Sequence, residues 1–283
     1  EAKAIYGQLD YAVAKDTTVT AGLRYTTEEK TGSVWRSTTV AYPMTTPVWS
    51  AGAAPGDVNE KADFSSVTPM FALSQKLDAN TMVFGRIAKG FKSGGFPLEA
   101  PTLAQAKKPF SPEESTSYEV GVKGATNMAS YSATVFMTKL KDQQISYLPV
   151  GGTSPTTTNA GASTYKGLEL EGAFKVSKDT KIQVGYGYLS AKFDEFLSPG
   201  LNGVTVDAAS NLVVGYAPKH TFNLNLESNL TKTEYGRLKG LVEYRYTGAY
   251  YNYAANKVAT AANANAGNLA ADSRMPSLGT INA

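Results

Sequence analysis

The sequence predicts an all-β protein, an antiparallel transmembrane β-barrel of the outer-membrane type, and three observations support this prediction. The 283 residues include 26 Gly and 17 Tyr, are 42% hydrophobic and 18% charged, and contain few helix-forming Glu/Leu/Lys blocks. The predicted strands are about 11 to 18 residues long, whereas globular strands usually have about 5 to 6 and a tilted strand crosses a bilayer in about 9 to 11. The connections alternate between very short polar turns and much longer loops, as they do at the two rims of outer-membrane barrels.

The composition excludes several other classes of protein. No run of about 18 apolar residues occurs, so the chain has no candidate α-helical membrane span. The net charge of +3 is small and spread along the chain, without the basic cluster that a nucleic-acid partner would need. The chain has no cysteine and therefore neither disulfides, thiolate metal sites nor cysteine nucleophiles.

The strands follow one another as hairpins. Residues 2–14 and 18–32 are predicted to pair across a tight polar turn. Residues 81–96, TMVFGRIAKGFKSGGF, begin as a strand over 81–91 and run without a helix signal into a Gly-rich loop. The other predicted strands are 59–77, 114–124, 131–148, 158–176, 181–196, 219–230, 237–253 and a last one from 276. The total is about eleven strands.

Long loops are predicted at residues 33–58, 93–112 and 197–216, with a shorter loop at 149–157 and an Ala/Asn-rich loop that ends at Arg274. Aromatic and basic side chains in the first two loops have the chemistry to grip a bulky chelate through stacking and charge. Ordinary loop packing is the alternative for each of them. The candidate ligand-binding residues are Trp35, Arg36, Tyr42, Trp49 and Phe96.

The alternation within strands predicts which face of the sheet meets lipid. In 219–230 the residues Phe222, Leu224 and Leu226 share one face, and a polar set shares the other. The apolar face can meet lipid, whereas unpaired polar groups in hydrocarbon cost several kcal/mol, so the polar face must line the lumen. The same pattern in 158–176 places Leu168 and Leu170 toward lipid. The predicted polar network of the lumen comprises Glu169, Glu171, Asn223, Asn225 and Glu227.

Five phrases of the sequence, in this order, resemble the barrel of TonB-dependent outer-membrane receptors. They are YGQLDYAVAKDTTVTAGLRYTTEEK (6–30), RIAKGFKSGGF (86–96), SPEESTSYEVGVKG (111–124), NAGASTYKGLELEGAF (159–174) and APKHTFNLNLES (217–228). Barrels of this family have 22 strands around an N-terminal plug. The resemblance therefore implies that residues 1–283 are about half of a barrel domain, without the plug and the final strands. It also implies a bacterial outer-membrane location.

The resemblance further implies the partners of the parent protein. These are outer-membrane lipid, an inner-membrane TonB-type energy-coupling protein that acts through the missing plug, and a scarce bulky nutrient. Ferric siderophores are the commonest substrates of the family, and cobalamin and oligosaccharides are alternatives. No resident cofactor or metal is implied, and no match to the haem-receptor motif is present.

Three other chemistries that the sequence could suggest have plainer structural interpretations. His220 is the only histidine, so a Ser-His-Asp triad of an outer-membrane hydrolase would have to use it, but a turn-proximal histidine is the simpler interpretation. Glu169 and Glu171 could form an acid–base pair, although a lumen ion network explains them better. The KSGGF segment lacks the GK[ST] and the helix of a phosphate-binding loop. We therefore expect no catalytic and no metal-binding residues.

The resemblance thus implies a receptor for energised uptake of a scarce, bulky solute, with a ferric siderophore as the first expected substrate, and not an enzyme. A passive porin-type channel is the first alternative, because it would share the barrel. An outer-membrane hydrolase that uses His220 is the second.

Overall fold

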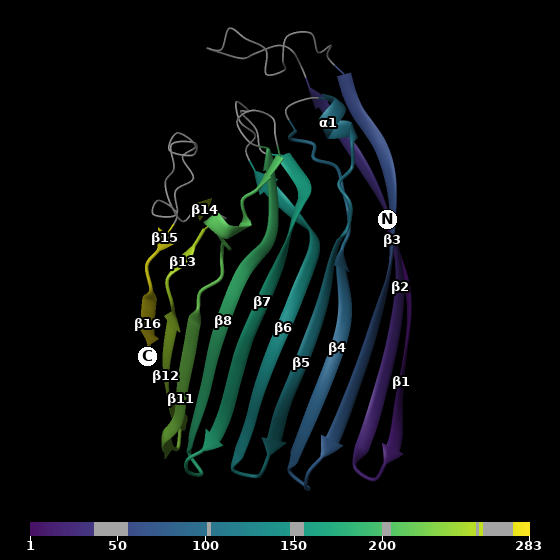
Figure 1. Ribbon diagram of the computed structural model, residues 1–283. Coiled ribbons are helices and arrows are strands. Elements are labelled where there is room, and N and C mark those ends of the chain that lie inside the picture. Colours follow the sequence, from purple (N-terminus) through teal and green to yellow (C-terminus); the bar gives the residue numbers. More distant parts are fainter. Residues whose placement is uncertain (37–55, 101–102, 148–155, 200–204, 253–254, 257–273) are drawn as a thin grey trace.

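The computed structural model describes residues 1–36, 56–100, 103–147, 156–199, 205–252, 255–256 and 274–283 (Figure 1). Their main feature is one tall, curved antiparallel sheet in which each strand pairs with its neighbours along the path β1-β2-β3-β4-β5-β6-β7-β8-β11-β12-β16. The strands of this path are β1 (Ala2–Ala14), β2 (Thr17–Arg36), β3 (Gly56–Lys76), β4 (Thr81–Lys92), β5 (Glu113–Ala125), β6 (Ala129–Tyr147), β7 (Thr156–Lys175), β8 (Thr180–Pro199), β11 (His220–Thr233), β12 (Gly236–Thr247) and β16 (Leu278–Asn282).

The path confirms the predicted meander of about eleven antiparallel strands. Short turns join the strands at one end of the sheet, and the longer connections lie at the other end (Figure 1). Within the described residues β1 pairs only with β2, and β16 pairs only with β12, so the two edges of the sheet are not joined to each other. The sheet is therefore an open section of wall. No helix in the described part of the chain is long and apolar enough to cross a membrane.

The strand bounds agree closely with the sequence prediction at the short turns and less well at the loops. Strand β1 has the predicted bounds, whereas β2 extends to Arg36 and β3 begins at Gly56. The predicted strand 237–253 is wrong at its end, because β12 stops at Thr247 and only Tyr250–Tyr251 (β13) continues, paired with Arg274–Met275 (β15).

Two predicted loops contain further structure. Residues 93–112 include a short helix, α1 (Leu103–Lys107), which the sequence analysis missed. Residues 197–216 include β9 (Thr205–Asp207), the 3₁₀ turn η1 (Ala209–Asn211) and β10 (Leu212–Val213), and β10 pairs with β14 (Ala255–Asn256).

Large aromatic side chains cover glycines of the adjacent strand on the concave face. A Cβ built on Gly121 would lie 2.7 Å from Phe84 Cζ, and one built on Gly167 would lie 2.5 Å from Phe136 Cζ. Each ring occupies the space that a neighbouring side chain would need, so the glycines allow close packing within a single sheet. This packing replaces the conventional core that a one-layer sheet lacks.

Most apolar side chains on the opposite, convex face are exposed. Along the register they form rows, for example Val120, Val135 and Leu168. Val120 is 62% exposed and Val135 is 53% exposed. An apolar surface of this extent needs apolar surroundings. For a sheet of long strands whose other face carries polar side chains, those surroundings are a lipid bilayer.

Candidate functional site: the lumen wall and the loop rim

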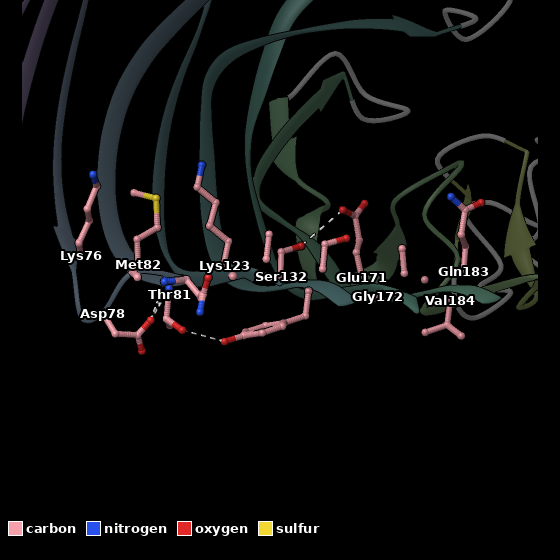
Figure 2. Close-up of a pocket in the computed structure, with 18 of the residues that line it drawn as sticks. Lys76, Asp78, Thr81, Met82, Lys123, Ser132, Glu171, Gly172, Gln183 and Val184 are labelled. Atoms are coloured by element: carbon pink, nitrogen blue, oxygen red, sulfur yellow. Dashed lines mark hydrogen bonds between the residues drawn. The ribbon is translucent and has the colours of Figure 1, made fainter. Parts of the chain in front are cut away.

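A hollow of about 740 Å³ lies on the concave face, close to the short turns. Its lining crosses the sheet along one row of the register, from Lys76 through Met82, Lys123, Ser132, Glu171 and Gly185 to Asn223. Figure 2 shows Lys76, Lys123 and Glu171 on the same side of the sheet, with Val184 on the other side. The polar face therefore presents a continuous row of side chains across these strands.

The five residues of the predicted lumen network lie on this concave face. Asn223, Asn225 and Glu227 alternate with Phe222, Leu224 and Leu226 along β11, and Glu169 and Glu171 occupy equivalent positions on β7. Asn223 pairs in register with Gly185, which in turn pairs with Glu171, so these residues form one row.

Hydrogen bonds and ion pairs link part of the set to neighbouring strands. Ser132 Oγ donates to Glu171 Oε2 at 3.4 Å, and Lys239 Nζ lies 3.2 Å from Glu227 Oε1. Arg245 approaches Glu243 at 3.8 Å. The predicted carboxylate pair of β7 is thus part of a polar wall, with Glu171 engaged by a serine hydroxyl rather than by a second carboxylate.

One polar atom of the hollow has no internal partner. The side-chain Oδ1 of Asn225 is buried and accepts no hydrogen bond from a described residue.

The segment that follows β4 lies at the loop end of the concave face, opposite the short turns. We call residues 93–112 the rim loop. Its Phe96 packs over β2, where a Cβ built on Gly32 would lie 2.7 Å from Phe96 Cγ, and Gly95 exchanges backbone hydrogen bonds with Phe110 of the same loop. Lys107 of α1 lies 3.4 Å from Glu60 on β3. The described part of the rim loop is therefore folded against the inner surface of β2 and β3.

Two amide side chains fasten the base of the rim loop. Asn159 Nδ2 donates to the carbonyl oxygens of Ser111 (2.9 Å) and Asp142 (2.7 Å), while its Oδ1 accepts from the backbone N–H of Ser111 at 2.6 Å. Gln144 Nε2 donates to the carbonyl oxygens of Ser93 (2.9 Å) and Ser111 (3.1 Å). A β-bulge at Asp142, whose φ is +51°, turns β6 toward these contacts.

A second rim element is built above β8. Asp207 Oδ1 accepts backbone N–H groups from Phe196 (2.9 Å) and Ala209 (3.0 Å). The backbone N–H of Ala209, and to a smaller extent that of Phe196, stabilises the ionised carboxylate, so the pKa of Asp207 lies below its usual value. Beneath this turn a small buried cluster fills the rim and consists of Ile145, Ala160, Phe193, Phe196, Ala209 and Leu212.

The candidate ligand-binding residues are only partly placed. Phe96 is half-buried on the concave side of β2. Trp35 and Arg36 are the last residues of β2, described by their backbone and paired with Asp57 and Gly56 of β3. Tyr42 and Trp49 lie outside the described residues.

His220 lies away from the hollow. It is exposed on the convex face at the start of β11, where its Nδ1 is 2.9 Å from the hydroxyl of Tyr186 and its ring is 5.5 Å from that of Tyr188. Its surroundings are thus aromatic, which agrees with the plain structural interpretation of this histidine. No group of three or more His, Cys, Asp or Glu side chains suited to a metal ion occurs among the described residues.

An open wall with an apolar outer face, a polar inner face, short turns at one rim and structured loops at the other defines an outer-membrane β-barrel. The whole chain, residues 1–283, matches the family model for the TonB-dependent receptor-like β-barrel. The chain therefore belongs to the TonB-dependent receptor β-barrel family of the bacterial outer membrane, a family of transport receptors and not of enzymes.

Individual relatives agree with this membership. The chain is 25% identical over 193 residues to a pesticin receptor of Yersinia enterocolitica and 24% identical to that of Yersinia pestis, in each case over 68% of this chain. The sheet superposes on the ferric yersiniabactin uptake receptor FyuA of Yersinia pestis with a TM-score of 0.72 at 20% identity over 99% of this chain. It superposes on the siderophore receptor PiuA of Acinetobacter baumannii with a TM-score of 0.65 at 18% identity.

The chain is short beside these proteins. It spans 26% of the length of the curated relatives and 37% of the FyuA chain. At such identities the solved structures establish the fold, and the substrate of each belongs to that protein.

Proposed function

We propose that this segment is part of the barrel domain of a longer receptor that takes up a scarce, bulky solute across the outer membrane, using energy from an inner-membrane coupling protein. The family membership carries this proposal. A ferric siderophore is the proposed substrate, because the solved structures that this chain resembles include a ferric yersiniabactin uptake receptor and the siderophore receptor PiuA.

We propose that the ligand is held at the loop rim by Trp35, Arg36, Tyr42, Trp49 and Phe96. The described part of the rim supports this assignment, because Asn159 and Gln144 hold the base of the rim loop and Phe96 is held on the inner face of β2. A preorganised rim loses little conformational freedom when it binds a rigid chelate.

We further propose that the hollow receives the plug of the parent protein. The polar residues that line the hollow, which include Asn223, Asn225 and Glu171, offer both donors and acceptors to such a domain. The coupling protein would then act on the plug rather than on this wall.

Uptake by intact cells tests the proposal against the passive channel. Cells that carry the full-length receptor are supplied with a panel of ⁵⁵Fe-labelled siderophores, with and without a protonophore. We expect saturable uptake of at least one chelate that stops when the proton-motive force is dissipated. Uptake that persists in de-energised cells, together with ion conductance by the purified protein, would establish the porin instead.

Two variants connect uptake to the rim. Phe96→Ala is expected to weaken binding of the transported chelate while leaving the receptor folded in the outer membrane. Tyr235→Ala is the matched control, because Tyr235 is an aromatic residue that is 93% exposed in the short turn at the other rim. Equal binding by the wild type and both variants would remove Phe96 from the ligand site.

A further inference from the structure

Four lysines from four different strands converge on the convex face of the sheet. The register places Lys89 (β4), Lys139 (β6) and Lys192 (β8) in one row, separated by Thr116 and Thr164. Lys166 of β7 lies one step lower, between Met137 and Ser190. All four side chains are exposed. We call these residues the lysine row.

The spacing allows the ammonium groups to share one ligand. Lys139 and Lys192 flank the same central strand, so their Cα atoms are about 10 Å apart, and Lys166 sits diagonally between them at about 7 to 8 Å from each. Flexible lysine stems readily span such separations, so three ammonium groups can point at a single multivalent anion.

Few carboxylates neutralise this cluster. Lys192 Nζ lies 2.7 Å from Asp194 Oδ1, and Thr164 Oγ1 also donates to that carboxylate. Lys139 is within electrostatic reach of the same group. The next row up brings Glu114, opposite Lys141, and Glu195, opposite Ala162. At the level of the lysine row itself, one carboxylate thus faces four ammonium groups.

An apolar groove lies directly below the lysine row. It has a volume of about 470 Å³, and it forms where Gly85 leaves no side chain between Leu73 and Val120. The other apolar residues of the convex face that line it are Phe71, Ile87, Tyr118, Val135 and Met137. Ile87 is two residues before Lys89, and Met137 is two residues before Lys139, so the groove leads to the lysines on the same face.

The height of the lysine row matches a membrane boundary. From Thr180 at the short turn to Ser190, β8 advances about 33 Å, which at a tilt of about 40° corresponds to about 25 Å of membrane, the usual height of the apolar band. Outward side chains below this level, such as Val184, Tyr186 and Tyr188, are apolar or aromatic. The lysine row therefore lies at the loop-side membrane surface, where the headgroups of the outer leaflet begin.

We propose that the lysine row and the groove beneath it bind a phosphate-bearing lipid of the outer leaflet, with the phosphate on Lys139, Lys166 and Lys192 and acyl chain in the groove. Lysine is a common binder of phosphate as a point charge, and a basic residue at a membrane surface attracts anionic headgroups. The site is on the outer surface of the wall and does not depend on the transport that we propose for the lumen.

Lipid binding to the purified full-length receptor tests the site. The delipidated receptor is titrated with diphosphorylated lipid A and with its dephosphorylated form, and bound lipid is counted by native mass spectrometry. The test variant is Lys139→Gln/Lys166→Gln/Lys192→Gln. The matched control, Lys15→Gln/Lys178→Gln/Lys232→Gln, removes three exposed lysines from the short-turn end.

We expect the wild type and the control variant to bind the phosphorylated lipid alike. The test variant should bind it at least about tenfold more weakly, since each lysine at a membrane surface contributes about fivefold. Equal binding by the two triple variants, or no preference for the phosphorylated lipid, would overturn the proposal. Displacement of the lipid by millimolar inorganic phosphate would identify a site for a free anion rather than for a lipid.

The single variant Lys166→Gln serves if the triple variant does not fold. It leaves the Lys192–Asp194 ion pair intact, and it should still bind the phosphorylated lipid several-fold more weakly than the wild type.

Discussion

The close packing of Phe136 over Gly167 predicts that Gly167→Ala destabilises the barrel. A Cβ at this position would lie 2.5 Å from Phe136 Cζ and also 2.5 Å from the carbonyl oxygen of Tyr188. The ring can rotate away, but the carbonyl belongs to β8, which is hydrogen-bonded to both β7 and β11 and cannot retreat. Overpacking of this kind costs typically about 1–3 kcal/mol.

The matched control is Gly85→Ala, because the nearest atom to a Cβ on Gly85 is a backbone oxygen 3.9 Å away. We expect this variant to stay within about 0.5 kcal/mol of the wild type. The assay is urea unfolding of the full-length receptor in detergent, with the folded fraction measured by its faster migration in unheated gels. Equal unfolding midpoints for the two variants would refute the packing argument, and a larger loss for Gly85→Ala would reverse it.

Three further predictions concern the rim and the lumen wall. Asn159→Ala removes three hydrogen bonds to Ser111 and Asp142, so we expect faster limited proteolysis within residues 93–112. Because the pKa of Asp207 is lowered, the ionised carboxylate stabilises the rim turn fully above the usual Asp pKa, and this stabilisation is lost as the pH falls through the lowered pKa. Hydrogen exchange of residues 205–214 should therefore accelerate only in acid. Lys239→Ala breaks the exposed ion pair with Glu227, and the free energy of unfolding, measured by urea titration, should change by less than about 1 kcal/mol.

The strand framework could be predicted from sequence because one physical rule acts on almost every residue. Between lipid and lumen each second side chain must be apolar, so the pattern of β11 fixes its own faces without reference to any neighbour. The short turns were predicted well for the same reason, since Lys15 and Asp16 interrupt the alternation between β1 and β2. The apolar row through Leu168 then follows from the pairing of strands.

The rim could not be predicted in the same way. Helix α1 has only five residues, too few to carry a periodic signal, and its position depends on contacts distant in sequence, such as Lys107 with Glu60 and the burial of Ala106. The loop residue Phe96 was predicted by residue type alone. Its position over Gly32 depends on how the rim loop folds back onto β2.

The lysine row was missed for a different reason. Lys89, Lys139, Lys166 and Lys192 are up to about a hundred residues apart, and no two of them lie on the same strand. Only the register of five consecutive strands brings them to the same height on the same face. A charge cluster that arises from sheet register leaves no local signature.

Both the proposed lumen function and the proposed lipid site require that the convex face meets lipid and the concave face lines the lumen. One measurement on β11 tests this assignment of the two faces directly. The segment has no native cysteine, so single cysteines can be placed at Phe222, Asn223, Leu224 and Asn225 and labelled with a small fluorophore. The labelled full-length receptor, once reconstituted in bilayers that contain brominated lipids, should show strong quenching at Phe222 and Leu224 and weak quenching at Asn223 and Asn225. Quenching that does not alternate, or that is stronger at the asparagines, would contradict the assignment of the wall.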